Sequence, residues 1–174
     1  NLFGSLSIGV DQPFRVGDFV KVEDVVGTVE TVGLRSTRIR TLDRTLVTIP
    51  NGKLADMRIE SFTVRDRFRL SCTLGLVYGT TAAQIREVLA GSEAAMRAEP
   101  TFFKEDFTVV LRGFGASSVD LDVTGWFEEP TWGDFLQARQ RILLRIMEVV
   151  EKSGTELAFP TQTLYVKQDS KWQL

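Results

Sequence analysis

The stretch FTVVLRGFGASSVDLDVTG, residues 107–125, decides the fold of the second half of this chain. Apolar side chains stand at every second position on both sides of a glycine-rich centre: Phe107, Val109, Leu111, Val119, Leu121 and Val123. Such alternation is typical of half-buried strands, and a glycine cluster between two of them is typical of a hairpin. We therefore predict an antiparallel hairpin with Gly113-Phe114-Gly115 at its turn, and with Asp120 and Asp122 facing water.

A helix is predicted on each side of this hairpin. Before it, Thr81-Ala82-Ala83-Gln84 has the pattern of a capping box, and Pro100 ends the apolar periodicity that follows. After it, Thr131 caps a second helix with Asp134 at the third position, and Gly154 marks its end.

Two further strands complete the expected order of elements. One is predicted at Phe68–Tyr78 and a last one at Thr161–Val166. The order β-α-β-β-α-β is that of the ferredoxin-like fold, which we expect over residues 67–174.

The preceding part of the chain, residues 13–66, has a different hydrophobic pattern. Short valine- and isoleucine-rich runs are separated by turn residues: Gly17-Asp18, Glu23-Asp24, Gly27, Asp43-Arg44 and Pro50-Asn51-Gly52. Short strands at this spacing favour a small barrel of the SH3 or Sm type. The predicted fold class is thus α+β, a small SH3/Sm-like β-barrel domain followed by a ferredoxin-like domain.

Residues 1–12 form a third zone. Leu2, Leu6 and Val10 share one side of a helix, and small residues occupy much of the rest, which suits a short amphipathic helix pressed against neighbours. A disordered terminus is the alternative for this segment taken alone.

The amino-acid composition excludes several kinds of functional site. The 174 residues carry 21 basic and 23 acidic side chains, no histidine and one cysteine. Nucleophile pairs and metal sites that need imidazole are therefore excluded, and we predict no catalytic residue, no metal site and no cofactor. The longest charge-free stretch, Leu70–Ile85, is too short and too broken to span a bilayer, for which about 20 apolar residues are needed. The chain begins without methionine, and we expect it to be a piece of a longer protein.

Three motifs that suggest chemistry have a simpler structural interpretation. Gly113–Ser118 lies between two strands, with neither a helix nor a lysine after it, so a hairpin turn is favoured over a phosphate loop. Glu128 and Glu129 are adjacent and point opposite ways in an extended chain. Asp120 and Asp122 share a strand face, but two carboxylates fall short of a cation site.

A cluster of basic residues in the barrel zone carries more weight. Over residues 35–58 only Asp43 and Asp56 oppose six basic side chains: Arg35, Arg38, Arg40, Arg44, Lys53 and Arg58. Contact with RNA phosphates is one interpretation, and it makes a nucleic-acid-binding module the alternative function. No interleaved aromatic residues accompany the cluster, so we favour a solvated or inter-subunit salt-bridged face. A further interpretation is that the face sets the local potential along a permeation route.

Several motifs together resemble one known family, the small-conductance mechanosensitive channels (MscS-like). The segments that match in order and spacing are Asn1-Leu2-Phe3-Gly4-Ser5-Leu6-Ser7-Ile8, Gln12-Pro13-Phe14-Arg15-Val16-Gly17-Asp18, Val26-Gly27-Thr28-Val29, Ser36-Thr37-Arg38-Ile39-Arg40, Ile49-Pro50-Asn51-Gly52-Lys53, Gly115-Ala116-Ser117-Ser118 and Phe159-Pro160-Thr161-Gln162-Thr163. The resemblance covers essentially the whole chain.

The resemblance implies a multi-pass homoheptameric channel in the cytoplasmic membrane of a bacterium, which releases ions and small solutes on hypo-osmotic shock. Residues 13–66 and 67–174 would form its cytoplasmic vestibule, and residues 1–12 the end of its third transmembrane (pore) helix. The lipid bilayer would be contacted through upstream helices, and nucleic acid is no partner.

The amphipathic spacing and the family order also suggest a gating contact. We expect Asn1, Leu2 and Leu6 to transmit the state of the pore by touching the turn at Asn51 and Gly52.

Overall fold

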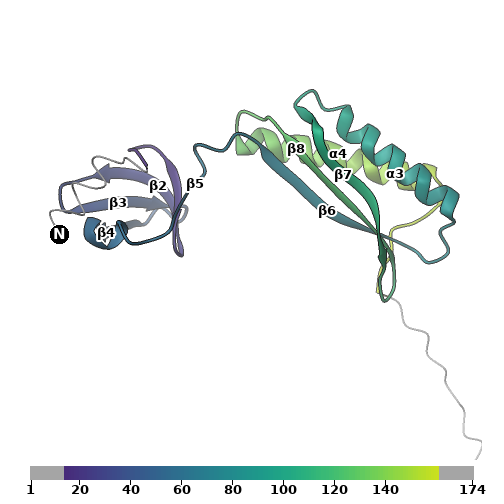
Figure 1. Cartoon of the computed structure of the whole chain (residues 1–174), viewed down its shortest axis with the longest axis horizontal. Coiled ribbons are helices and arrows are strands. Elements are labelled where there is room, and N and C mark those ends of the chain that lie inside the picture. Colours follow the sequence, from purple (N-terminus) through teal and green to yellow (C-terminus); the bar gives the residue numbers. More distant parts are fainter. Residues whose placement is uncertain (1–13, 161–174) are drawn as a thin grey trace, which may run out of the picture. The chain divides into compact units, whose positions relative to one another are not determined.

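The structure is a computed structural model that describes residues 14–160, and it divides after Asp66 into two compact units (Figure 1). The first unit contains β1 (Phe19–Val22), β2 (Val25–Val32), β3 (Ser36–Thr41), β4 (Leu46–Pro50), α2 (Asn51–Leu54) and β5 (Ile59–Ser61). The second contains β6 (Phe68–Leu76), α3 (Ala82–Arg97), β7 (Phe102–Phe114), β8 (Val119–Phe127) and α4 (Trp132–Lys152). The α+β class is confirmed, with two antiparallel sheets.

The first unit is a five-stranded sheet in the order β4-β3-β2-β1-β5. Its core is formed by the apolar side chains that alternate inward along these strands, together with the loop residue Phe14 and Leu54 of α2: Phe14, Val20, Val22, Val29, Ile39, Ile49 and Leu54. The pairings of residues 14–160 do not join β4 to β5, so closure into an SH3/Sm-like barrel stays a prediction.

Two predicted turns of this unit are wrong in detail. Gly27 lies inside β2 rather than at a turn, because the opposite strand passes so close that only a residue without a side chain fits. The Pro50-Asn51-Gly52 turn is the start of α2, which begins at Asn51.

The second unit is a three-stranded sheet in the order β6-β8-β7, with α3 and α4 on the same face (Figure 1). Helix α3 contacts β7 and helix α4 contacts β6, and the helices touch where Gly91 meets Val149. Its core is made of side chains from both helices and all three strands, among them Met96, Phe127 and Ile142.

The predicted helix signals of this unit are confirmed. The Thr81 side chain accepts from the Gln84 amide while the Gln84 side chain accepts from the Thr81 amide, a complete capping box. Thr131 accepts from the amide of Asp134 at 3.1 Å. Gly154, with φ +70°, lies just after α4 in the left-handed region that glycine adopts without strain.

The hairpin of β7 and β8 is also confirmed, although the turn is shifted. Gly113 and Phe114 belong to β7, and the Gly115 amide donates to the Ser118 carbonyl at 2.7 Å across the turn. The predicted N-terminal helix and the strand at Thr161–Val166 lie outside the described residues. Within residues 14–160 the structure has no helix of the length and apolarity that crossing a membrane requires.

Candidate functional site: the arginine face of the first unit

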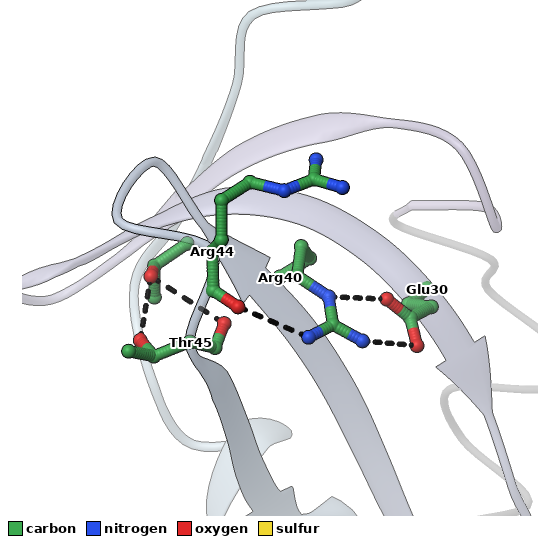
Figure 2. A network of polar contacts seen from close by, with 5 residues as sticks. Glu30, Arg40, Arg44 and Thr45 are labelled. Atoms are coloured by element: carbon green, nitrogen blue, oxygen red, sulfur yellow. Dashed lines mark hydrogen bonds and ion pairs between the residues drawn. The ribbon is translucent and has the colours of Figure 1, made fainter.

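The predicted basic face centres on Arg40 of β3, and a β-bulge gives it an acidic partner. Ile39 pairs with Val29, but the register between β2 and β3 then shifts, and Glu30 is the extra residue. Arg40 Nε donates to Glu30 Oε2 at 2.6 Å and its second terminal nitrogen to Oε1 at 2.9 Å (Figure 2). The remaining terminal nitrogen donates to the Arg44 carbonyl at 3.1 Å. All three nitrogens of this guanidinium are thus used within the first unit.

The electrostatics of the pair follow from this geometry. The hydrogen bond from Arg40 holds the pKa of the Glu30 carboxyl below its ordinary value, and the positive charges of Arg40, Arg38 and Arg44 add to the effect. The same hydrogen bond raises the pKa of Arg40. Both side chains are partly exposed, so the pair orders the surface more than it stabilises the fold.

Two of the other predicted arginines, Arg38 and Arg44, act on the charge of Glu30, whereas Arg35 lies at the opposite end of β3 from Arg40. Arg38 is exposed on β3, two residues from Arg40, on the face opposite the buried Ile39. Arg44 is in the β3–β4 turn with φ 67°. Arg35 is in the loop between β2 and β3, where its carbonyl accepts from a backbone amide of α2. The Glu30 carboxylate offsets one of the four positive charges.

Sequence reasoning missed Glu30, because it counted only the acidic residues between positions 35 and 58. One signal was present. Val29 and Val32 are three residues apart, whereas a regular strand places side chains of one face two apart. The bulge lies between them, so Val29 pairs with Ile39 and Val32 with Thr37, two residues on the same buried face of β3.

The predicted contact residue Asn51 has an internal role. Its side chain is 1% exposed; Oδ1 accepts from the Thr37 hydroxyl at 2.9 Å and Nδ2 donates to the Gly33 carbonyl at 2.8 Å. Its backbone amide donates to the Arg35 carbonyl at 3.0 Å. Asn51 therefore holds the loop between β2 and β3 against the start of α2.

Asn51 and Gly52 are the first two residues of α2. Gly52 is the more accessible of the two, being half-buried. Asn1, Leu2 and Leu6, their predicted partners, lie outside the described residues.

The second unit has an ionic cluster of its own, around Glu99. This carboxylate is 3% exposed and lies just after α3. Arg141 of α4 donates to both of its oxygens at 3.2 and 2.8 Å, and Arg145, one turn later, donates at 2.9 Å. The hydrogen bond from Arg141 is the main cause that holds the Glu99 pKa below its ordinary value, with the charges of both arginines assisting and burial opposing.

We expect Glu99→Gln to lower the free energy of unfolding of the second unit by about 2 kcal/mol at neutral pH, since charged hydrogen bonds are lost in a buried place. The folded-state pKa is depressed, so this contribution is complete above the ordinary carboxyl pKa of 4.5 and disappears as the pH falls through the lower folded value. Urea unfolding followed by tryptophan fluorescence at pH 7 and below 4.5 measures it. Glu93→Gln, which removes an exposed i,i+4 partner of Arg97, is the control and should cost much less. A difference between Glu99→Gln and the wild type that is the same at both pH values would contradict the argument.

No group of three or more metal-binding side chains of the types His, Cys, Asp and Glu occurs in the part of the chain that the structure describes. Asp122 accepts a hydrogen bond from Thr73 at 2.9 Å, and Asp120 accepts one from Ser118 at 2.7 Å. Burial raises the pKa of the half-buried Cys72 thiol, which favours its protonated form at neutral pH.

Comparison with known families identifies the chain. Residues 1–63 match the family described as "Mechanosensitive ion channel, beta-domain", and residues 70–157 match "Mechanosensitive ion channel MscS, C-terminal". The chain belongs to the MscS family of mechanosensitive ion channels. The predicted family is thereby confirmed, and it is a family of channels rather than a class of enzymes.

Individual relatives agree with this membership. The chain is 39% identical over 170 residues to the small-conductance mechanosensitive channel MscMJ of Methanocaldococcus jannaschii, with 98% of this chain and 48% of the relative covered. It is 28% identical over 169 residues to the low conductance channel YnaI of Escherichia coli, with 95% and 49% covered. The chain thus spans about half the length of these MscS relatives.

Solved structures share the fold. The closed-state crystal structure of Helicobacter pylori MscS superposes with a TM-score of 0.79 at 19% identity, covering 97% of this chain and 65% of that one. The structure of Arabidopsis thaliana MSL1 superposes with a TM-score of 0.84 at 20% identity, covering 91% and 58%. Neither the MscS family matches nor these neighbours support the nucleic-acid-binding alternative.

Proposed function

We propose that this MscS-family chain is the cytoplasmic vestibule portion of a bacterial mechanosensitive channel. In the full-length protein, a homoheptamer of the inner membrane, it encloses the space through which ions and small solutes leave on hypo-osmotic shock. The observation that carries the proposal is the match of both units, in chain order, to the two MscS domain families.

Three regions have separate roles in this proposal. Residues 1–12 form the end of the pore helix, residues 13–66 an Sm-like β domain, and residues 67–174 a ferredoxin-like α/β domain. Helices in the remainder of the full-length channel contact the bilayer. This chain catalyses no reaction. Its two units enclose the vestibule and connect it to the pore.

The arginine face has an electrostatic role in this vestibule. Arg35, Arg38 and Arg44 set a positive local potential, while Glu30 offsets the charge of Arg40 and fixes its position. Rings of one charge sign influence which ions gather in a permeation path.

The gating contact is also part of the proposal. Asn1, Leu2 and Leu6 touch the first turn of α2, and Gly52 offers the accessible backbone there. Asn51 holds this turn in place, because its side chain is hydrogen-bonded to the Thr37 hydroxyl and the Gly33 carbonyl.

Patch recordings test both statements. The full-length channel, expressed in cells without their own mechanosensitive channels, should pass current under membrane tension. Gly52→Trp should change its opening threshold or inactivation, because a bulky side chain separates the two contacting segments. Gly79→Trp is the matched control, since Gly79 has no heavy atom within 4 Å of its Cβ position.

The outcomes separate the two ideas. Absence of tension-activated current with verified insertion in the membrane would overturn the proposed function. Normal current in the wild type together with unchanged Gly52→Trp currents would overturn only the gating contact.

A further inference from the structure

Arg38 lies in the middle of a row of three polar side chains on the outer face of the first sheet. It is paired with Thr31 of β2 on one side and with Thr48 of β4 on the other. Residues directly opposite each other on antiparallel strands carry their side chains on the same face, with Cβ atoms about 5 Å apart. Because Ile39, the next residue of β3, is buried on the other face, the three side chains point outward together. We call these three residues the Arg38 row.

The side chains of the Arg38 row are accessible to a ligand. All three are exposed, and within residues 14–160 none of them makes a hydrogen bond or an ion pair. The Arg38 guanidinium thus keeps its donors, in contrast to Arg40, whose three nitrogens are all used.

The neighbouring carboxylate does not compete for Arg38. Glu30 comes directly before Thr31 in the chain, but Arg40 donates to both of its oxygens (Figure 2). Arg38 and Arg44 act on Glu30 only through their charge. An anion that approaches the Arg38 row therefore meets a guanidinium that has no bound partner of its own.

The donors of the Arg38 row suit a tetrahedral oxyanion better than a carboxylate. A guanidinium presents its N–H groups in a fixed fork that binds two oxygens of one anion. The Thr31 and Thr48 hydroxyls add one donor on each side of this fork. A carboxylate has only the two oxygens that the fork uses, whereas a phosphate group has at least one more for a hydroxyl.

We infer that Thr31, Arg38 and Thr48 bind a phosphate group, supplied either by a soluble phosphate or by a lipid headgroup. The inference rests on the proposed vestibule and deepens the electrostatic role of its arginine face. Arg38 binds the anion directly, while Arg44, which lies in the β3–β4 turn outside the row, contributes only to the potential.

Equilibrium dialysis of the full-length channel against radiolabelled inorganic phosphate tests the site. In a maltoside detergent, which contains no phosphate, the wild type should bind phosphate saturably. Arg38→Gln should weaken this binding about tenfold, because charge-assisted hydrogen bonds are lost. Joint replacement by Thr31→Val and Thr48→Val should weaken it several-fold. Absence of saturable binding, or equal binding by the wild type and Arg38→Gln, overturns the inference.

Two control variants separate a binding site from a general positive field. Arg44→Gln removes a charge of the same face and should weaken phosphate binding much less than Arg38→Gln does. Thr108→Val removes an exposed strand hydroxyl of the second unit, where Thr124 is the opposite residue and no arginine is in register, and should have no effect. Equal losses from Arg38→Gln and Arg44→Gln would reveal a field without a site and would overturn the inference.

The same measurement in nanodiscs that contain phosphatidylglycerol distinguishes the two sources of phosphate. Binding of free phosphate that persists in these discs assigns the site to a soluble phosphate. Binding that occurs in detergent but is lost in the discs assigns it to a lipid headgroup, whose phosphate then occupies the row. Both results support phosphate recognition by Arg38.

These results are independent of the proposed function. A channel that conducts under tension but binds no phosphate retains the function and loses the site. Phosphate binding that depends on Arg38, without any tension-activated current, retains the site and loses the function.

Discussion

Gly27→Ala should lower the free energy of unfolding of the first unit by about 3 kcal/mol, a large value for one added methyl group. A Cβ at this position would lie 2.2 Å from the carbonyl oxygen of Arg40 and 2.9 Å from a side-chain carbon of Ile39. The nearer atom is backbone, so relief requires that β2 and β3 move apart. That movement also carries Arg40 away from Glu30.

Native-state hydrogen exchange at the amides of β2 and β3 measures this loss, because the described tryptophans are all in the second unit. Gly113→Ala is the control: Gly113 is also a strand glycine, but no heavy atom lies within 4 Å of its Cβ position. If the β2 and β3 amides were equally protected from exchange in both variants, the two strands would have adjusted to the added methyl group without loss of stability.

Asn51→Ala should destabilise the first unit by about 2–4 kcal/mol, because two polar groups lose their partner at once. The Thr37 hydroxyl is fully buried and would remain without its acceptor, and the Gly33 carbonyl would lose its donor. An unpaired buried polar group costs more than the hydrogen bond contributed, since no water replaces it.

A double-mutant cycle with Thr37→Val checks the mechanism. The double variant should lose clearly less than the sum of the single losses, because the buried hydroxyl has then been removed as well. Gln140→Ala, which deletes an exposed amide on α4, is the control and should change stability little. Strictly additive losses would mean that Asn51 acts through some contact other than Thr37.

Both predictions concern residues whose role was visible in the sequence only in part. Gly27 was predicted at a turn because glycine marks turns more often than strand interiors. Glycine is in fact needed here because the backbone of Arg40, 13 positions later in the chain, leaves no room for a side chain. Asn51 was predicted as part of a turn that the N-terminal segment contacts, since a Pro-Asn-Gly sequence usually forms a turn. Its burial depends on Thr37 and Gly33 arriving from the strand pair before it.

The elements of the second unit were more accessible to prediction. The capping residues Thr81 and Thr131 act on amides three positions away, and the hairpin of β7 and β8 is marked by alternation on both sides of its glycines. These signals are local, so they need no knowledge of the rest of the fold. The turn itself was misplaced by two residues, because the bulge between Leu111 and Gly113 lengthens β7.

The chain by itself therefore determined the α+β class, the caps and hairpin of the second unit, and a composition without histidine. Its motifs, matched in order, also determined its place among the MscS-like channels. Only the tertiary structure decided that Arg40 is bound to Glu30 and that Asn51 is internal. Each of these depends on strand register and bulges, and a shift of one residue in pairing exchanges the two faces of a strand.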